Sequence, residues 1–248
     1  MSIMILPSEY PRTRGYSGPA PADAAYWRLK RAVDVLSSGI GLVVLLPVFL
    51  MVILAIKLDS RGPIIYAQER VGKNRRRGPR RAGESRPAEV PPAGVDRREA
   101  DCFGRPFKIY KFRSMVADAE KHTGPVWATR ADARVTRVGK ILRLTRLDET
   151  PQLWNVLKGD MSLVGPRPER PTFVVSLAKT LPEYTNRCQA LPGVTGLAQV
   201  RWRYDTSIET VNRKLQYDLY YIRYGRLLLD LKIMAATFRV MVRGDGAV

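Results

Sequence analysis

The longest uncharged run of the chain lies near its N-terminus and predicts a membrane-inserted helix. Residues 35 to 56 read VLSSGIGLVVLLPVFLMVILAI, without one charged side chain. About 20 apolar residues are enough for a helix to cross the hydrocarbon core of a bilayer. A cleavable signal peptide does not fit, because the run starts late, is too long and lacks a small-residue cleavage site after it.

Two features of this run favour a re-entrant helix over residues 26 to 58. Pro47 lies near its middle, where a missing N–H and a bulky ring predict a kink. Both flanks are basic, although positive charge normally stays on the cytoplasmic side, and a helix that enters, bends and returns keeps them together. A proline-kinked single span is the alternative. The flanking cations are Arg28, Lys30 and Arg31 before the run, and Lys57, Arg61, Arg70 and Lys73 after it.

Downstream, β-branched and aromatic residues predict two strands that pair as a small hairpin. They are residues 62 to 68, GPIIYAQ, and 107 to 115, FKIYKFRSM. Residues 73 to 105 between them are rich in Arg, Pro and Gly and nearly free of bulky apolar residues, which predicts a disordered basic insertion. Residues 1 to 25, with Pro, Gly, Ser and Ala, predict a disordered tail. The remainder, 59 to 248, is expected to form one catalytic domain.

Apolar residues recur among basic ones between positions 211 and 243. This pattern predicts amphipathic helices at a membrane interface, and ordinary core packing explains it almost as well. Asp218 lies within this stretch, where a functional role and a structural polar contact are equal alternatives. The fold class we expect is therefore mixed α+β and helix-dominated, a monotopic membrane protein with a re-entrant helix, a small hairpin and interfacial helices.

Charge then narrows the partners. The chain has 42 Lys plus Arg against 23 Asp plus Glu, a formal net charge of +19. Its partners are therefore expected to be anions, such as nucleic acid, acidic lipid or phosphorylated small molecules. The single histidine, His122, excludes histidine clusters for a metal. Carboxylates, lysines and arginines must then carry most of any catalysis.

Asp148 and Glu149, here called the acidic pair, precede a predicted helix. Thr150 and Pro151 form a good helix start, and Gly159 ends the segment. The pair thus lies at the positive end of a helix dipole, which favours ionised carboxylates and also a bound phosphate. Arg143 and Arg146 just ahead of it are expected to lower the carboxyl pKa. A helix start that simply favours acids is the alternative reading.

Several cations are candidate phosphate ligands. Alternation along the second strand sets Lys111 and Arg113 on one face, where they grip a phosphate or form an exposed charged strand face. Arg167 lies between Pro166 and Pro168, which stiffen its backbone and suggest a prebuilt diphosphate clamp beside the acidic pair. Arg201, with Arg203, is expected to extend a strand-like segment over residues 191 to 200.

Seven segments in a fixed order carry a family resemblance. They are KRAVDVLSSGIGLVVLLPVF, GPIIYAQERVG, FKIYKFRSM, RVTRVGKILRLTRLDETPQLWNVLKGDMSLVGPRPERP, PGVTGLAQV, KLQYDLYYI and LLDLKIM. Together they resemble the bacterial sugar transferase family, the monotopic phosphoglycosyl transferases of exopolysaccharide and other glycoconjugate pathways. The resemblance runs from about residue 27 to 243 and is interrupted by the basic insertion.

This resemblance implies an activity and a location. Family members transfer a phosphosugar from a UDP-sugar to a polyprenyl phosphate, usually undecaprenyl phosphate, and release UMP with Mg²⁺ as cofactor. By the resemblance, the enzyme lies in the bacterial inner membrane with its active site facing the cytoplasm. Members with additional domains can dimerise, so a homodimer stays an open alternative. The exopolysaccharide-type C-terminal segment favours a hexose such as glucose or galactose as the transferred sugar.

The resemblance also assigns roles to residues. Asp148 corresponds to a nucleophile that forms a covalent phosphosugar intermediate, and Glu149 completes the metal site or manages a proton. Pro47 corresponds to the break of the re-entrant helix, although Leu46 stands where many members carry Ser. Mg²⁺ is expected on Asp148 and Glu149. The expected phosphate ligands are Lys111, Arg113, Arg146, Arg167 and Arg201.

Two other classes compete with this reading. A basic nucleic-acid-binding membrane protein would explain the charge and the arginine-rich insertion, but no other feature supports it, so no nucleic acid is expected as partner. A noncatalytic membrane scaffold would tolerate loss of Asp148, whereas a phosphoglycosyl transferase would not.

Overall fold

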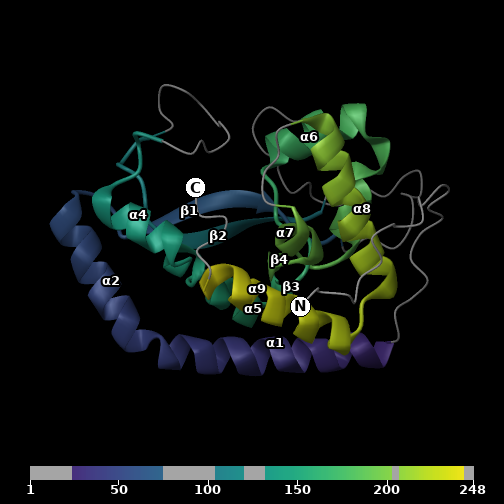
Figure 1. Cartoon of the computed structure of the whole chain (residues 1–248), viewed down its shortest axis with the longest axis horizontal. Coiled ribbons are helices and arrows are strands. Elements are labelled where there is room, and N and C mark those ends of the chain that lie inside the picture. The colour runs from purple at the N-terminus through teal and green to yellow at the C-terminus, as the bar shows by residue number, and fades with distance from the viewer. Residues whose placement is uncertain (1–23, 75–103, 120–131, 203–206, 243–248) are drawn as a thin grey trace, which may run out of the picture.

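Helices dominate the computed structural model, which describes residues 24–74, 104–119, 132–202 and 207–242 (Figure 1). Residues 1–23 of the predicted tail and most of the predicted insertion lie outside these residues, as does Arg203. The predicted end of the tail at residue 25 was wrong, because Ala24 and Ala25 begin the first helix. Within the described residues the sheets are small, one antiparallel and one parallel, each of two strands. The predicted helix-dominated α+β class is confirmed. The helices are α1 Ala24–Val44, α2 Leu46–Asp59, α4 Arg137–Leu144, η1 Leu147–Glu149, α5 Gln152–Lys158, α6 Pro171–Thr180, η2 Pro182–Gln189, α7 Leu197–Arg201, α8 Ile208–Tyr224 and α9 Leu227–Val242.

The N-terminal hydrophobic segment forms two helices that meet at Leu45 with a bend of 58°. Pro47 lies in the first turn of α2, where the absent N–H of proline costs no helical hydrogen bond. The break therefore falls two residues before the proline. No single described helix is long and apolar enough to cross a membrane, whereas α1 and α2 meet that requirement together, as a bent pair.

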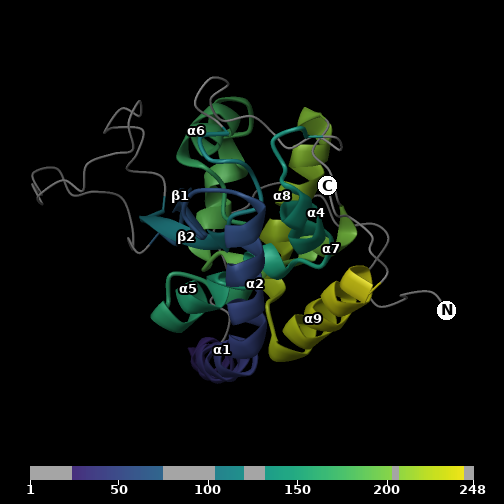
Figure 2. The same ribbon diagram turned by 90° about the vertical axis from the view of Figure 1, so that its left-hand side faces the viewer.

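The outer surface of this bent pair is apolar and largely uncovered. The apolar side chains on α1 and α2 with more than half of their surface exposed include Leu36, Ile40, Val43, Leu50, Met51 and Leu54. On the inner side, Val52 and Ile56 pack with Phe112 and Leu142 in one hydrophobic cluster. Figures 1 and 2 show α1 along one edge of the molecule, with α5 and α9 next to it and α6 at the opposite end.

The predicted hairpin is confirmed as the antiparallel strands β1 Ile65–Val71 and β2 Pro106–Phe112. The ladder continues past both strands, because Gly72 N donates to Arg105 O at 2.9 Å and Arg105 N donates to Lys73 O at 3.2 Å. Lys73 and Arg105 were predicted within the disordered insertion. That boundary was wrong, since backbone pairing holds both residues at the loop end of the hairpin, next to Val71 and Pro106.

A second, parallel sheet pairs β3 Ser162–Val164 with β4 Gly193–Thr195. The strand-like segment predicted over residues 191 to 200 is therefore wrong beyond Thr195, because α7 follows at once. Gly196 separates the two elements at a point where an added Cβ would lie 2.1 Å from the carbonyl oxygen of Gly165. Leu197 and Ala198 are both buried, although they are consecutive, whereas consecutive side chains of a strand point to opposite faces. This burial fits the helix better than a continued strand.

The C-terminal helices differ in what their apolar faces contact. In α8, Leu215, Leu219 and Ile222 are buried in a cluster with Val174 and Tyr184, so core packing explains this helix. In α9, Leu229 and Ile233 are buried, whereas four large apolar side chains are exposed. The exposed ones are Leu228, Leu231, Phe238 and Met241.

Candidate active site

The acidic pair lies in a tight turn between two helices. After α4, Arg146 adopts a left-handed conformation with φ 59°, and the single 3-10 turn η1 then carries Asp148 and Glu149. Pro151 is the N-cap of α5, one residue before the helix rather than its first residue as predicted, and Gly159 follows the helix with φ 87°, as the sequence predicted. Asp148 and Glu149 are each only 8% exposed. Two carboxylates this close together and this well buried need cations nearby.

Two cationic side chains pair with Glu149. Its Oε1 accepts from Lys111 Nζ at 2.5 Å and from Arg167 Nη2 at 3.1 Å. Burial raises the pKa of Glu149, but the Lys111 and Arg167 cations outweigh it and hold the pKa well below its ordinary value. Burial lowers the pKa of Lys111, and Glu149 opposes that shift. The structure thus brings together a strand lysine, the acidic pair and the Pro-Arg-Pro segment, which is far along the chain from the strand.

Asp148 has a different environment. Its Oδ1 is buried and makes no hydrogen bond within the part of the chain that the structure describes. Burial and the adjacent Glu149 carboxylate raise its pKa, and Lys111, Arg143 and Arg146 only partly offset them. The expectation that the preceding arginines would lower this pKa was therefore wrong for Asp148. Burial raises this pKa by more than those arginines lower it.

Arg113 does not join Lys111 at the acidic pair. Its guanidinium donates to Ser60 O at 2.6 Å, Ser60 Oγ at 2.9 Å and Arg61 O at 3.0 Å, just past the end of α2. Strand β2 ends at Phe112, so the two-residue alternation no longer applies at the next position. Arg113 thus satisfies carbonyl groups at a helix C-terminus.

The two remaining predicted phosphate ligands also differ. Arg146 acts electrostatically on both members of the acidic pair, in keeping with its place one turn ahead of them. Arg201 ends α7. Its Nη2 is buried without a hydrogen-bond partner among the described residues, whereas the ion pairs of Glu149 are made by Lys111 and Arg167.

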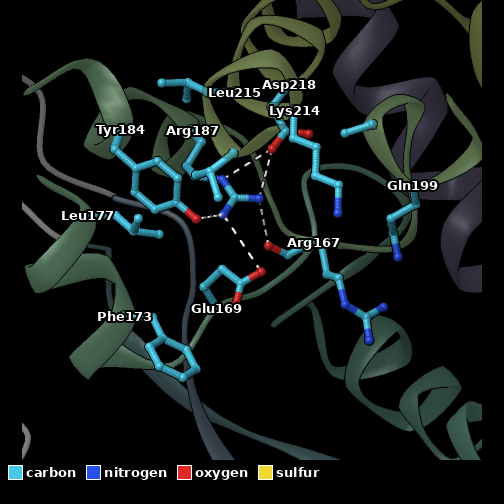
Figure 3. A pocket seen from close by; sticks show the side chains of 12 residues that line it. Arg167, Glu169, Phe173, Leu177, Tyr184, Arg187, Gln199, Lys214, Leu215 and Asp218 are labelled. Carbon is cyan, nitrogen blue, oxygen red and sulfur yellow. Dashed lines mark hydrogen bonds and ion pairs between the residues drawn. The ribbon is translucent and has the colours of Figure 1, made fainter. Parts of the chain in front are cut away.

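The backbone around Arg167 is held on every carbonyl, which sequence reasoning missed. Pro166 O accepts from Gly193 N at 2.8 Å and Glu169 O accepts from Val71 N at 2.9 Å. The carbonyls of the two residues between these, Arg167 and Pro168, accept from arginine side chains. Arg187 Nη2 donates to Arg167 O at 3.0 Å, and Arg70 Nη1 donates to Pro168 O at 3.1 Å. Asp218 is part of this arrangement, because it pairs with Arg187 at 2.7 Å (Figure 3).

The donor set can be tested against Mg²⁺. The described residues contain no group of three or more His, Cys, Asp or Glu that could hold a metal. Mg²⁺ is, however, commonly held by one or two carboxylates together with substrate phosphates and water. The unpaired Oδ1 of Asp148 fits that pattern. Glu149 fits it less well, because its Oε1 already accepts from two cations.

The fold and the site together define a helix-dominated α+β protein in which a buried acidic pair lies among lysine and arginine side chains, beside a bent apolar helix pair. The sequence model of the family described as bacterial sugar transferase matches residues 25–77 and 95–244. This chain belongs to the bacterial sugar transferase family, as its resemblance predicted.

The chain is similar to three named proteins. The chain is 39% identical over 222 residues to an Aeromonas hydrophila protein, UDP-N-acetylgalactosamine-undecaprenyl-phosphate N-acetylgalactosaminephosphotransferase, which covers 90% of this chain but 45% of that protein. It is 38% identical over 249 residues to the UDP-glucose:undecaprenyl-phosphate glucose-1-phosphate transferase of Caulobacter vibrioides, covering 99% of this chain and 81% of that one. It is 38% identical over 224 residues to the exopolysaccharide production protein PSS of Rhizobium leguminosarum bv. phaseoli, covering 88% and 98%.

Proposed function

We propose that this protein transfers a sugar-1-phosphate from a UDP-sugar to undecaprenyl phosphate and releases UMP. The observation that carries the proposal is the arrangement of the acidic pair, in which Lys111 and Arg167 neutralise Glu149 while Asp148 keeps an unpaired carboxylate oxygen beside it. Such an arrangement suits a nucleophile that must approach an anionic diphosphate. The names of the Aeromonas and Caulobacter relatives support the same reaction class.

The reaction we propose has two displacements at one phosphorus. First, an Asp148 oxygen bonds to the phosphorus that carries the sugar, and the bond from that phosphorus to the bridging oxygen breaks, so UMP leaves with the electron pair. Then an oxygen of undecaprenyl phosphate attacks the same phosphorus and displaces Asp148, which regains its carboxylate. The intermediate is an acyl phosphate, an activated linkage, and ping-pong kinetics are expected.

The residues around Asp148 have separable roles in this proposal. The raised pKa of Asp148 makes its ionised form a stronger nucleophile than an ordinary carboxylate. Arg167 leaves 41% of its side chain exposed, so it can turn part of its guanidinium to an arriving phosphate while Glu149 holds the rest. Lys111 and Arg146 add positive potential. Mg²⁺, held by Asp148 with help from Glu149, would neutralise diphosphate charge when bound.

UMP release tests the proposal directly. We expect the purified protein, with Mg²⁺ and undecaprenyl phosphate, to release UMP from at least one of UDP-glucose, UDP-galactose and UDP-N-acetylgalactosamine. A hexose donor is our prediction, although the names of the relatives include both glucose and N-acetylgalactosamine. Omission of the lipid should limit UMP to about one equivalent per enzyme. An enzyme that releases no UMP from any of these donors in the presence of lipid would contradict the proposed reaction.

The bent helix pair supports a re-entrant membrane segment, which would hold the active site at the cytoplasmic face of the inner membrane. In a background without the native cysteines, Arg28→Cys and Arg61→Cys place thiols at the two ends of the segment. We expect a membrane-impermeant maleimide to label both from the cytoplasmic side only. Labelling from opposite sides would instead establish a single kinked span. A cysteine on an external loop of a known spanning protein serves as the sidedness control.

A further inference from the structure

The Pro-Arg-Pro segment is stiffer than its prolines require. All four carbonyls from Pro166 to Glu169 accept hydrogen bonds from groups of other segments, and two of these donors are arginine side chains. A proline ring fixes only its own φ, so the orientation of the Arg167 peptide still depends on what holds its carbonyl. Arg187 supplies that contact, at 3.0 Å.

Arg187 is itself held from several sides. Its Nε and Nη2 both donate to Asp218 Oδ2, at 3.1 and 2.7 Å, and its Nη1 donates to the Tyr184 hydroxyl at 2.6 Å. Glu169 lies 4.0 Å from the same Nη1. Arg187 and Asp218 are 8% and 2% exposed, so neither can leave the other without stranding a buried charge. Figure 3 shows the guanidinium at the centre of these contacts, with the Arg167 side chain directed away from it.

These groups line a recess that is too small to bind the sugar of a UDP-sugar donor. Its volume is about 50 Å³, whereas sites for drug-sized ligands hold roughly 300 Å³ or more. Arg187 already uses its donors on protein acceptors. Arg187 therefore binds the backbone of Arg167 rather than a ligand in the recess.

We propose that Arg187, oriented by Asp218, is a positioning residue for the reaction: it fixes the Arg167 peptide so that the Arg167 guanidinium meets both Glu149 and a phosphate of the donor. The inference rests on the phosphate-binding role of Arg167 in the proposed function. A misplacement of about 1 Å in a binding group can reduce a rate about a hundredfold. The role requires the planar guanidinium of arginine, because one lysine ammonium cannot donate to Asp218, Tyr184 and Arg167 O in the same directions.

Binding of UDP, with Mg²⁺, to the full chain gives a test that does not depend on turnover. Titration calorimetry would compare wild type, Arg187→Lys, Arg167→Ala and the double variant. We expect Arg187→Lys to weaken UDP binding about tenfold in the wild-type background and to have no further effect once Arg167 is alanine. Asp218→Asn should behave in the same way with a smaller effect, and thermal unfolding of each variant confirms that the protein is folded at the assay temperature.

Arg31→Lys is the matched control, since Arg31 also donates to two backbone carbonyls, those of Val156 and Leu157, at 2.6 and 2.9 Å. Any effect that it has should be the same with and without the Arg167 side chain. Equal effects of Arg187→Lys in both backgrounds, or unchanged UDP binding by Arg187→Lys and Asp218→Asn, would overturn the inference and leave the proposed function standing. Unchanged binding by Arg167→Ala would overturn the phosphate role itself, and the inference with it.

Discussion

Replacement of Asp148 by asparagine is expected to lower turnover at least about a thousandfold and to raise thermal stability. The loss follows because an amide cannot form the acyl phosphate. The gain follows from the raised pKa of Asp148, caused first by burial and then by Glu149. A carboxyl group with a raised pKa stabilises the fold below its unfolded pKa and loses that contribution as the pH rises through the folded pKa. Above its unfolded pKa the carboxyl group therefore stabilises the fold less than it does in acid, and asparagine, which does not ionise, removes that penalty.

The measurement combines activity, mass and unfolding. Donor and Mg²⁺ without lipid should add a phosphosugar to Asp148 of the wild type, located by peptide mass spectrometry, and nothing to Asp148→Asn. The unfolding midpoint of the variant at neutral pH should rise by about 2–4 °C, the shift that roughly 1 kcal/mol produces in a protein of this size. A fully active wild type that never carries the adduct, or a variant that keeps ordinary turnover, would refute the nucleophile assignment.

Replacement of Glu149 by glutamine is expected to lower stability, in contrast to Asp148→Asn, and to reduce turnover about a hundredfold. Although burial raises the pKa of Glu149, Lys111 and Arg167 hold it below the ordinary value. Such a group stabilises the fold above its unfolded pKa and loses that contribution as the pH falls through the folded pKa. At neutral pH the variant leaves Lys111 without its counter-ion in a buried site, so we expect a loss of about 3 kcal/mol.

Urea unfolding as a function of pH would check this. The stability difference between wild type and Glu149→Gln should be largest at neutral pH and shrink in acid, as Glu149 becomes protonated. Removal of the partner charge as well, in Lys111→Met with Glu149→Gln, should recover part of the loss. Asp160→Asn is the control, because Asp160 pairs with a half-exposed lysine, Lys158, at 3.2 Å and should change stability by less than about 1 kcal/mol. Equal stability of wild type and Glu149→Gln at neutral pH would contradict the cation cluster.

Local patterns in the sequence predicted local structure well. The β-branched and aromatic content of two segments predicted the pairing of β1 with β2, because such residues are enriched in strands. The helix start at Pro151 was equally legible, since proline and glycine act through their own backbone angles. Arg113 shows the limit of such reasoning. The alternation that placed it beside Lys111 holds only within the strand, and the strand ends one residue earlier.

Burial and long-range pairing could not be predicted in the same way. The arginines before Asp148 are visible in the sequence, but the desolvation that outweighs them depends on neighbours from several segments. Arg187 and Asp218 are 31 residues apart with no shared pattern. One signal did exist, because Leu215 and Leu219 flank Asp218 at helical spacing and mark it as facing the core. A carboxylate on a core face requires a partner, which favours the interpretation of Asp218 as a structural polar contact.

The way in which α1 holds α5 has a further consequence. Arg31 binds the last carbonyls of α5, and the absence of a side chain at Gly41 lets Leu153 approach α1 closely. Asp34 on the same helix accepts from Leu163 N at 3.0 Å, ahead of the Pro-Arg-Pro segment. The helix that carries Asp148 on its N-terminal side and the strand that leads to Arg167 are thus both held against α1. If α1 lies in a membrane, as we propose, a change in its tilt or depth would move Asp148 and Arg167 together, without altering the distance between them.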